Sequence, residues 1–446
     1  MDGLPSITKM FGIELEFFLV DREGKLVNKA DSIVKALKSK LTKTDITLEC
    51  GKSMLELVSF PHRSSRETFI KYIQDFETFL YELDVNDLGI YNFGTYPGIN
   101  NNEMRTESRY NVKKNILGEK NFVNAGKCIG FHYHYSLPRN SFNPNILFLY
   151  PDLNDRKKQK ILSLYNLYIA LDPAITTLMQ SSPYFEGKLM GKDSRIMVYR
   201  GDKSFEYPDS LYANHPEFGN LNEYSPDFNS FIKTITNRTS KWKELLAANN
   251  SSFSDFAKRK GASLLDSSWK PIKISPHGTI EMRGPDMNSI RKVVALSTLM
   301  NNVSKYVEKN FIKIIPGIIG NNDPFKLEDG NLYVPDQAYL SNLQKESAIY
   351  GFESQRVLRY CKSLLKLLKT IVSVEMMAPF RVFQKSVMDE KSKSDEIISF
   401  VKKRQGYSDY KEILPETVQD FAVKTSETIF KNLVITKKMI QEIYPC

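Results

Sequence analysis

The chain has 446 residues, of which 41% are hydrophobic and 12% aromatic, and its 62 basic and 52 acidic residues give a net charge of +10. This composition excludes fibrous, low-complexity and intrinsically disordered classes. An excess of positive charge would suit an anionic partner, but the lysines are spread along several predicted helices and accompany no nucleic-acid-binding motif. We therefore expect no nucleic-acid partner.

The four cysteines are widely spaced and form no CxxC pair, so they indicate neither a disulfide framework nor a zinc knuckle. The N-terminal segment lacks an uninterrupted apolar stretch, which together with the cysteines predicts a soluble protein of the cytoplasm. No run approaches the ~20 apolar residues of a membrane span, so we expect no membrane contact. The sequence leaves the oligomeric state open, with a homodimer as one option.

The first two-thirds of the chain combine strand and helix patterns. Alternating apolar residues, turn residues and a capping-box pattern place these elements. In chain order we predict strands at 11–20, 46–49 and 53–60, a helix from Ser64, a polar loop within 91–110, a strand at 127–137, helices at 155–179 and 228–248, and a strand at 278–283.

After Ser289 the sequence changes to amphipathic helical stretches separated by polar or Pro-containing connections. We predict an α+β fold with a mixed, mostly antiparallel sheet and helices packed on its outside. The expected organisation is a catalytic core over residues 1–288 and a helical C-terminal region, 289–446, packed on the same core.

Acidic residues recur inside the predicted strands. Glu14 and Glu16 are two apart in FGIELEFF and project from the same face. Two such acids cost several kcal/mol in an apolar strand unless a cation compensates them, although this pair alone fits a half-exposed polar face equally well. Glu49 and Glu56 add two acids on the arms of the predicted hairpin. Several carboxylates from separate strands favour a hard divalent cation such as magnesium.

Two later strands carry further polar groups. In GFHYHYSL, alternation places His132 and His134 on one face. A zinc site would need a third His or Cys ligand, and none is nearby. We therefore expect one imidazole to join the carboxylates as a metal ligand and His134 to support the ligands without contacting the metal. In GTIEMRGPD, Glu281 and Arg283 share a strand face, as an acid for a metal and a guanidinium for carboxylate or phosphate. Further cations in polar, Gly-containing stretches that could bind a nucleotide are Arg109, Arg195 and Arg200.

These motifs occur in a specific order between Gly12 and Arg283. The order is GxExEF, two acids seven apart, GTxP, RY, GxHxH, SPYxxG and ExR. It resembles the glutamate-cysteine ligase family two, the carboxylate-amine ligases of the glutamine-synthetase-like superfamily. The resemblance implies a curved sheet of glutamine-synthetase-like type and an ATP-dependent carbon-nitrogen ligase that acts on small molecules.

Carried over to this chain, the resemblance implies two or three Mg²⁺ ions, with Mn²⁺ as an alternative, and ATP as co-substrate. Glu16, Glu49 and Glu56 would hold one ion, and Glu14, His132 and Glu281 a second. Arg283, with Arg195 or Arg200, would act in catalysis, and Arg109, Arg195 and Arg283 would bind the nucleotide or a substrate carboxylate.

The reaction implied by the family is phosphorylation of the γ-carboxylate of glutamate by ATP, followed by attack of the cysteine amine. HYHYSLP favours cysteine as the acceptor, whereas Tyr96, Phe185 and Met190 depart from the usual family residues and leave another amine open. Two other classes stay open. One is a non-catalytic nucleotide- or nucleic-acid-binding protein, and the other is a metal-dependent hydrolase.

Overall fold

The computed structural model describes residues 11–62, 64–201, 205, 207–256, 263–267 and 269–443. The elements that build and surround the main sheet are β1 (Phe11–Asp21), α1 (Ala30–Leu37), β2 (Thr44–Leu48), β3 (Met54–Ser59), α2 (Ser65–Val85), β4 (Leu88–Tyr91), α3 (Ser108–Leu117), α4 (Glu119–Phe122), β5 (Phe131–Ser136), β6 (Phe142–Asn143), β7 (Phe148–Leu149), α5 (Asp155–Met179), β8 (Tyr184–Phe185), β9 (Lys188–Leu189), α6 (Ser194–Arg200), α7 (Pro216–Gly219), α8 (Phe228–Ala248), α9 (Phe253–Phe256), β10 (Ile272–Ser275) and β11 (Thr279–Met282).

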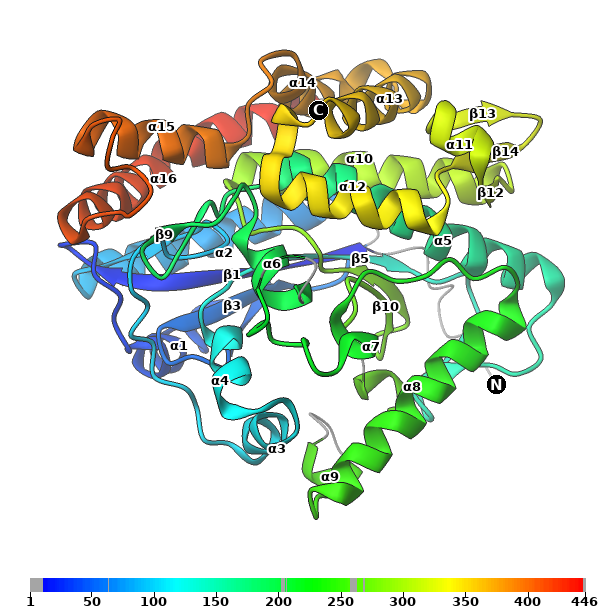
Figure 1. Cartoon of the computed structure of the whole chain (residues 1–446), viewed down its shortest axis with the longest axis horizontal. Helices are drawn as coiled ribbons and strands as arrows, with labels where there is room; N and C mark the ends of the chain where they lie inside the picture. The colour runs from blue at the N-terminus through cyan, green and yellow to red at the C-terminus, as the bar shows by residue number, and fades with distance from the viewer. Residues whose placement is uncertain are drawn as a thin grey trace.

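The rest of the chain is mainly helical and carries one small sheet. Its elements are α10 (Ile290–Lys309), β12 (Lys313–Pro316), α11 (Ile318–Asn322), β13 (Lys326–Glu328), β14 (Asn331–Val334), α12 (Gln337–Tyr350), α13 (Gln355–Ile371), α14 (Met377–Met388), α15 (Lys393–Gln405) and α16 (Pro415–Ile443). Figure 1 shows these helices stacked above and beside the main sheet.

The main sheet has the strand order β10-β11-β5-β1-β3-β2, and β4 also pairs with β1. Every pairing in it is antiparallel. A parallel pair occurs in the small sheet, between β12 and β14. The predicted α+β fold with a mostly antiparallel sheet and a helical C-terminal region is therefore confirmed, and the small sheet is an addition to it.

One face of the main sheet is apolar because alternate side chains of its strands point to the same side. Ile13, Leu15 and Phe17 of β1 are 0–1% exposed, and Phe17 lies 5.6 Å from Phe76 of α2 between ring centroids. Helices α5 and α10 contact the same sheet through β10, β11 and β5. The helices thus seal this face, and the intervening residues of each strand form the opposite face.

The helix and strand predictions match the structure closely. The helices predicted at 155–179 and 228–248 are α5 and α8, and the predicted cap of α2 is present, since the Ser64 side chain accepts a hydrogen bond from the Glu67 amide. The polar loop predicted at 91–110 ends earlier than expected, because α3 begins at Ser108.

Helix α5 combines length with an apolar composition. It is long and apolar enough to cross a membrane by length and composition, although 94% of its most apolar window is buried inside the protein. Polar residues such as Asn166 and Asp172 interrupt the run in sequence, yet they are buried with it. Helix α5 is therefore a core helix of the protein, because its apolar side chains are covered by other parts of the chain.

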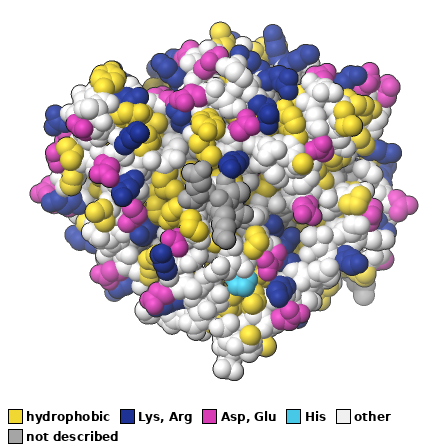
Figure 2. Space-filling model, in the orientation of Figure 1, with side chains coloured by type: hydrophobic (Ala, Val, Ile, Leu, Met, Phe, Trp, Pro, Cys, Tyr) yellow, Lys and Arg dark blue, Asp and Glu magenta, His cyan; other side chains and the backbone are white. Residues whose placement is uncertain are grey.

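The charges of the surface are mixed. On the face seen in Figure 2, Lys and Arg side chains lie among Asp and Glu side chains rather than in one block. Basic and acidic side chains are therefore interspersed on this face.

Candidate functional site

One face of the main sheet, the acidic face, collects acids and imidazoles from four strands through direct cross-strand pairing. Glu16 of β1 lies opposite Glu56 of β3, and Glu14 lies opposite His132 of β5. One strand further, His134 lies opposite Glu281 of β11. Because paired residues of neighbouring antiparallel strands share a face, the register alone brings these side chains together.

Glu16, Glu49 and Glu56 form the first group. One oxygen of each carboxylate lies within 4.8 Å of the others. Glu49 follows the end of β2, and Glu56 accepts a hydrogen bond from Thr47 Oγ1 at 3.1 Å. Burial raises the pKa of the Glu16 carboxyl; His132 opposes this rise and Glu49 adds to it. The group is therefore a set of two buried acids, Glu16 and Glu56, and one half-buried acid, Glu49, whose charges repel one another.

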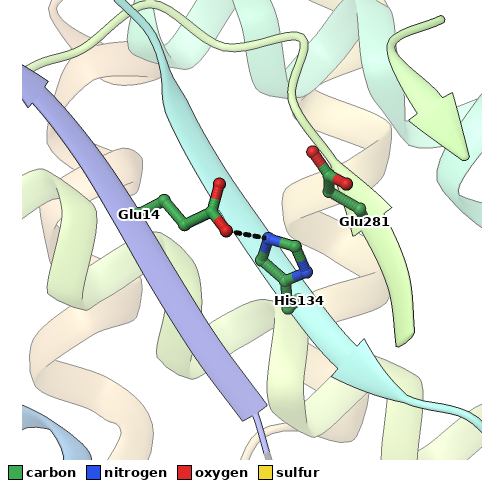
Figure 3. Close-up of side chains that lie close together, drawn as sticks. All are labelled: Glu14, His134 and Glu281. Carbon is green, nitrogen blue, oxygen red and sulfur yellow. Dashed lines mark ion pairs between the residues drawn. The ribbon is translucent and has the colours of Figure 1, made fainter. Parts of the chain in front are cut away.

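Glu14, His134 and Glu281 form the second group, again with ligand atoms within 4.8 Å of one another. Figure 3 shows the three side chains converging from β1, β5 and β11. His134 Nε2 lies 3.1 Å from Glu14 Oε1, and His134 Nδ1 lies 2.9 Å from Thr279 Oγ1. Burial would raise the pKa of Glu14, but His134 and His132 hold it well below its ordinary value.

His132 lies between the two groups. Its Nδ1 is 2.9 Å from Glu14 Oε2 and 3.7 Å from Glu56 Oε1, and its Nε2 is 3.6 Å from Glu16 Oε1. The predicted second metal set paired His132 with Glu14 and Glu281, whereas the structure gathers His134 with those two acids. The reason is register, since β11 places Glu281 opposite His134.

The residues of this face fit divalent cations. Glu16, Glu56 and Glu281 are at most 8% exposed, and the buried Nε2 atoms of both imidazoles face carboxylate oxygens without a well-aligned hydrogen bond. Buried acids need a compensating cation; the carboxylate oxygens suit Mg²⁺ or Mn²⁺, and an imidazole nitrogen beside them is a suitable further ligand for Mn²⁺. A bound divalent ion would supply positive charge to the phosphates of a nucleotide.

Two cations border the second group. Arg283 Nη1 donates to Glu281 Oε1 at 3.2 Å, and Lys273 Nζ lies 3.3 Å from Glu281 Oε2. Burial raises the pKa of Glu281, but Lys273 and Arg283 together outweigh it and lower the pKa to about 2. Glu281 thus connects the second group, which could hold a metal, to two basic side chains that could bind an anion.

Arg195 lies on α6 close to this face but donates to main-chain carbonyls. Its Nη1 bonds Gly284 O at 2.8 Å, and its Nη2 bonds Arg283 O at 3.2 Å. Gly130 leaves room for the guanidinium, because a Cβ there would lie 2.2 Å from Nη2. Arg195 therefore holds the turn that follows Glu281 and Arg283, and its predicted contact with phosphate stays a prediction.

The other two predicted arginines have protein partners. Arg200 forms a buried bidentate pair with Asp172 of α5, with N–O distances of 2.6 and 3.1 Å. Arg109 donates to Tyr110 Oη at 2.7 Å and lies 3.2 Å from Glu107. The structure thus places neither guanidinium among the acids, and their predicted roles stay predictions.

Sequence reasoning missed two site residues. Lys273 lies directly opposite Glu281 on β10, and reading IKIS as a strand that pairs with TIEM would have found it. Arg105 is 7% exposed in its side chain and donates from Nε to Glu49 O at 2.8 Å, which fixes the backbone that carries Glu49. It lies in the predicted polar loop, where no local pattern marks it.

The fold is shared with solved ligases. The glutamate-cysteine ligase of Francisella tularensis, solved in complex with AMP, matches with a TM-score of 0.57 at 16% identity over 98% of this chain and 92% of that one. A bifunctional glutathione synthetase from Pasteurella multocida matches with a TM-score of 0.52 at 13% identity, over 98% of this chain and 52% of that one. No curated protein matched the sequence.

The chain thus has the fold of these solved ligases, and acids and imidazoles of one face of its main sheet lie beside basic side chains. A family model described as Glutamate-cysteine ligase family 2 (GCS2) matches residues 10–304, and the chain belongs to this family. It is accordingly an ATP-dependent carboxylate-amine ligase that acts on small molecules such as ATP and amino acids.

Proposed function

We propose that the chain is a cytoplasmic glutamate-cysteine ligase that forms γ-glutamylcysteine for glutathione biosynthesis. The observation that supports this best is the gathering of carboxylates and imidazoles on one sheet face, with Lys273 and Arg283 at its border. Among the described residues, Cys50, Cys128 and Cys361 are buried free cysteines, which suits a reducing compartment.

The chemistry proceeds in two displacements. An oxygen of the glutamate γ-carboxylate attacks the γ-phosphorus of ATP, the bond to the β,γ-bridging oxygen breaks, and ADP leaves. The cysteine nitrogen then attacks the acyl carbon of γ-glutamyl phosphate, and the carbon-oxygen bond breaks to release phosphate. The ammonium loses two protons overall; one ends on phosphate and the other goes to solvent.

In this reaction the acidic residues would bind metal ions, and the basic residues would bind the anionic groups of the substrates. Glu16, Glu49 and Glu56 would hold one Mg²⁺ or Mn²⁺ ion. Glu14 and Glu281 would hold a second with an imidazole, for which His134 is better placed than His132. A bound ion neutralises phosphate charge, while Arg283 orients the anionic group being transferred.

A panel of acceptors tests the proposal. Purified protein with Mg²⁺, ATP and glutamate is given single amino acids or amines, ADP release is followed, and the product is identified by mass spectrometry. We expect cysteine-dependent ADP release and γ-glutamylcysteine. Turnover only with a different amine would replace cysteine as the acceptor, and the absence of amine-dependent ADP release with every acceptor would refute the proposal.

A further inference from the structure

Lys273 extends the polar row of the sheet by one strand. It lies directly opposite Glu281, which in turn lies opposite His134. Its side chain is 15% exposed, and its Nζ lies 3.3 Å from Glu281 Oε2. The row therefore runs ammonium, carboxylate, imidazole across β10, β11 and β5.

Strand alternation explains why a lysine reaches this place. Ile272 and Ile274, its neighbours on β10, are at most 2% exposed and point into the core, so Lys273 must point to the acidic face. Burial lowers the pKa of Lys273, and Glu281 counters that effect. The acid is thus the partner that makes a buried ammonium tolerable.

Glu281 has two competing tasks. Its oxygens contact Arg283 Nη1 at 3.2 Å and Lys273 Nζ at 3.3 Å, yet the same carboxylate belongs to the group with Glu14 and His134 that fits a divalent cation. A divalent cation in that group would lie close to the ammonium. Like charges at such separations repel, so a divalent cation would bind less tightly beside the ammonium.

We propose that Lys273 is a positioning residue that orients Glu281 and weakens divalent-cation binding at the Glu14–His134–Glu281 group until an anionic substrate arrives. A polyphosphate compensates the ammonium, so the group then binds its ion with full strength. Lys273 thereby couples the occupancy of the second group to that of the nucleotide. This inference rests on the metal assignment of the proposed function.

Mn²⁺ titration of the intact protein without ATP or glutamate, followed by electron paramagnetic resonance of free Mn²⁺, tests the coupling directly. For the wild type we expect a tight and a weak class of sites. Lys273→Gln should tighten the weak class about tenfold, because one repelling charge is lost. Lys273→Arg, which keeps the charge, should bind like the wild type. In the presence of the non-hydrolysable analogue AMP-PNP, the difference between the wild type and Lys273→Gln should shrink.

Lys160→Gln is the matched control. Lys160 is also a largely buried lysine beside a buried acid, with its Nζ 3.6 Å from Glu308 Oε1. This pair involves α5 and α10 rather than the acidic face, so the variant should leave Mn²⁺ binding unchanged. Lys273→Met, which keeps the length of the stem, replaces Lys273→Gln if the latter does not fold.

The outcomes separate this inference from the proposed function. Unchanged or weaker Mn²⁺ binding in folded Lys273→Gln would overturn the role of Lys273 and leave the ligase proposal intact. A wild type that binds no Mn²⁺ with or without AMP-PNP would instead overturn the metal assignment itself. Turnover of Lys273→Gln should fall with a changed dependence on Mg²⁺ concentration, which Lys273→Arg restores.

Discussion

The carboxylates gathered on the acidic face repel one another, which lowers stability when no cation is bound. Glu16 shares its group with Glu49 and Glu56, and burial raises its pKa. Glu16→Gln keeps the size and the acceptor oxygen toward the Gly130 amide but removes one of three repelling charges. We expect turnover to fall below about 1% of the wild type, because a metal ligand is lost, while the melting temperature without metal stays equal or rises.

The control for this change is Glu23→Gln, because Glu23 is exposed and pairs only with the neighbouring Lys25 among described contacts. It should leave both turnover and melting temperature unchanged. Full activity in Glu16→Gln, measured as ADP release with Mg²⁺, would contradict the assignment of Glu16 to a metal.

The two imidazoles provide a second test at this scale. His134 lies with Glu14 and Glu281, whereas His132 lies with Glu14 and Glu56. We expect His134→Ala to weaken Mn²⁺ binding in the presence of AMP-PNP at least as strongly as His132→Ala does, because its Nε2 faces the second group. A clearly milder effect of His134→Ala in calorimetry would restore His132 to that group.

Asp286 gives the protein a pH dependence outside the acidic groups. It is fully buried, and its Oδ2 accepts hydrogen bonds from the Ser181 amide at 2.9 Å and from Ser182 Oγ at 2.7 Å. Burial raises its pKa from 3.8 to about 6, against the attraction of Arg195. Between these values the folded state holds the proton more tightly, so this contribution to stability is complete below the lower value and is lost as pH rises through the higher one.

Asp286→Asn removes this titration. The free energy of unfolding of the variant, relative to the wild type, should therefore increase by about 2 to 3 kcal/mol between pH 4 and pH 7. Urea unfolding at several pH values measures the difference. A difference that does not change with pH would mean that the folded protein does not raise the pKa of Asp286.

Residue alternation within a strand can be inferred from the sequence, whereas pairing between strands cannot. In GIELEF, alternation alone places Glu14 on the same face as Glu16, and in GFHYHYS it places His132 on the same face as His134. Which imidazole meets Glu281 depends on the register of β5 against β11, separated by more than 140 residues. Arg105 was missed for the same reason, since its partner Glu49 is distant in sequence. Lys273 was missed because the short strand β10, which pairs with the nearby β11, was not predicted.

At the scale of elements, the length of a helix or strand decided whether it could be predicted from the sequence. Long periodic segments such as α5 and α8 were predicted with their observed bounds, whereas the four-residue β10 and the short β12, β13 and β14 carry too few residues for a period. Helix α6 was not predicted, because its sequence resembles part of a polar stretch. It has only seven residues, between the N-cap Asp193 and the C-cap Gly201, which is too few for a helical period to be recognised.

The pair between Arg200 and Asp172 joins α6 to α5 beneath the acidic face. Both side chains are at most 5% exposed, and a Cβ on Gly284 would lie 2.3 Å from Asp172 Oδ1, so the turn after β11 rests on the pair. Arg200→Met would leave a buried carboxylate without its partner, at a cost of about 3 to 5 kcal/mol. We expect a lower melting temperature and loss of activity through unfolding.

The double variant Arg200→Met/Asp172→Leu tests this explanation. Replacing both members by apolar residues removes the unpaired charge, so most of the lost stability should return. If Arg200→Met instead kept its melting temperature and lost only turnover, Arg200 would have the catalytic role that its family resemblance implies.

At the scale of the whole molecule, the helices after residue 304 continue the core that the family model covers. Phe421 of α16 lies 6.1 Å from Phe93 and 6.2 Å from Tyr91 between ring centroids. Lys437 of α16 pairs with Glu77 of α2, and Gly89 of β4 leaves room for Ser426. Helix α16 thus buries part of its apolar surface against the sheet region, and each of the two depends on the other for that burial.

The chain should therefore unfold as one unit, and its tryptophans offer a direct test. Both of them, Trp242 and Trp269, lie before residue 289, so their fluorescence reports the sheet-containing region, whereas far-UV circular dichroism is dominated by helices from the whole chain. We expect the two signals to give coincident midpoints in urea, because separating the helices would expose Phe421 and its partners to water. A dichroism transition that precedes the fluorescence transition would show that the region after 289 unfolds by itself, and would make it a separate domain.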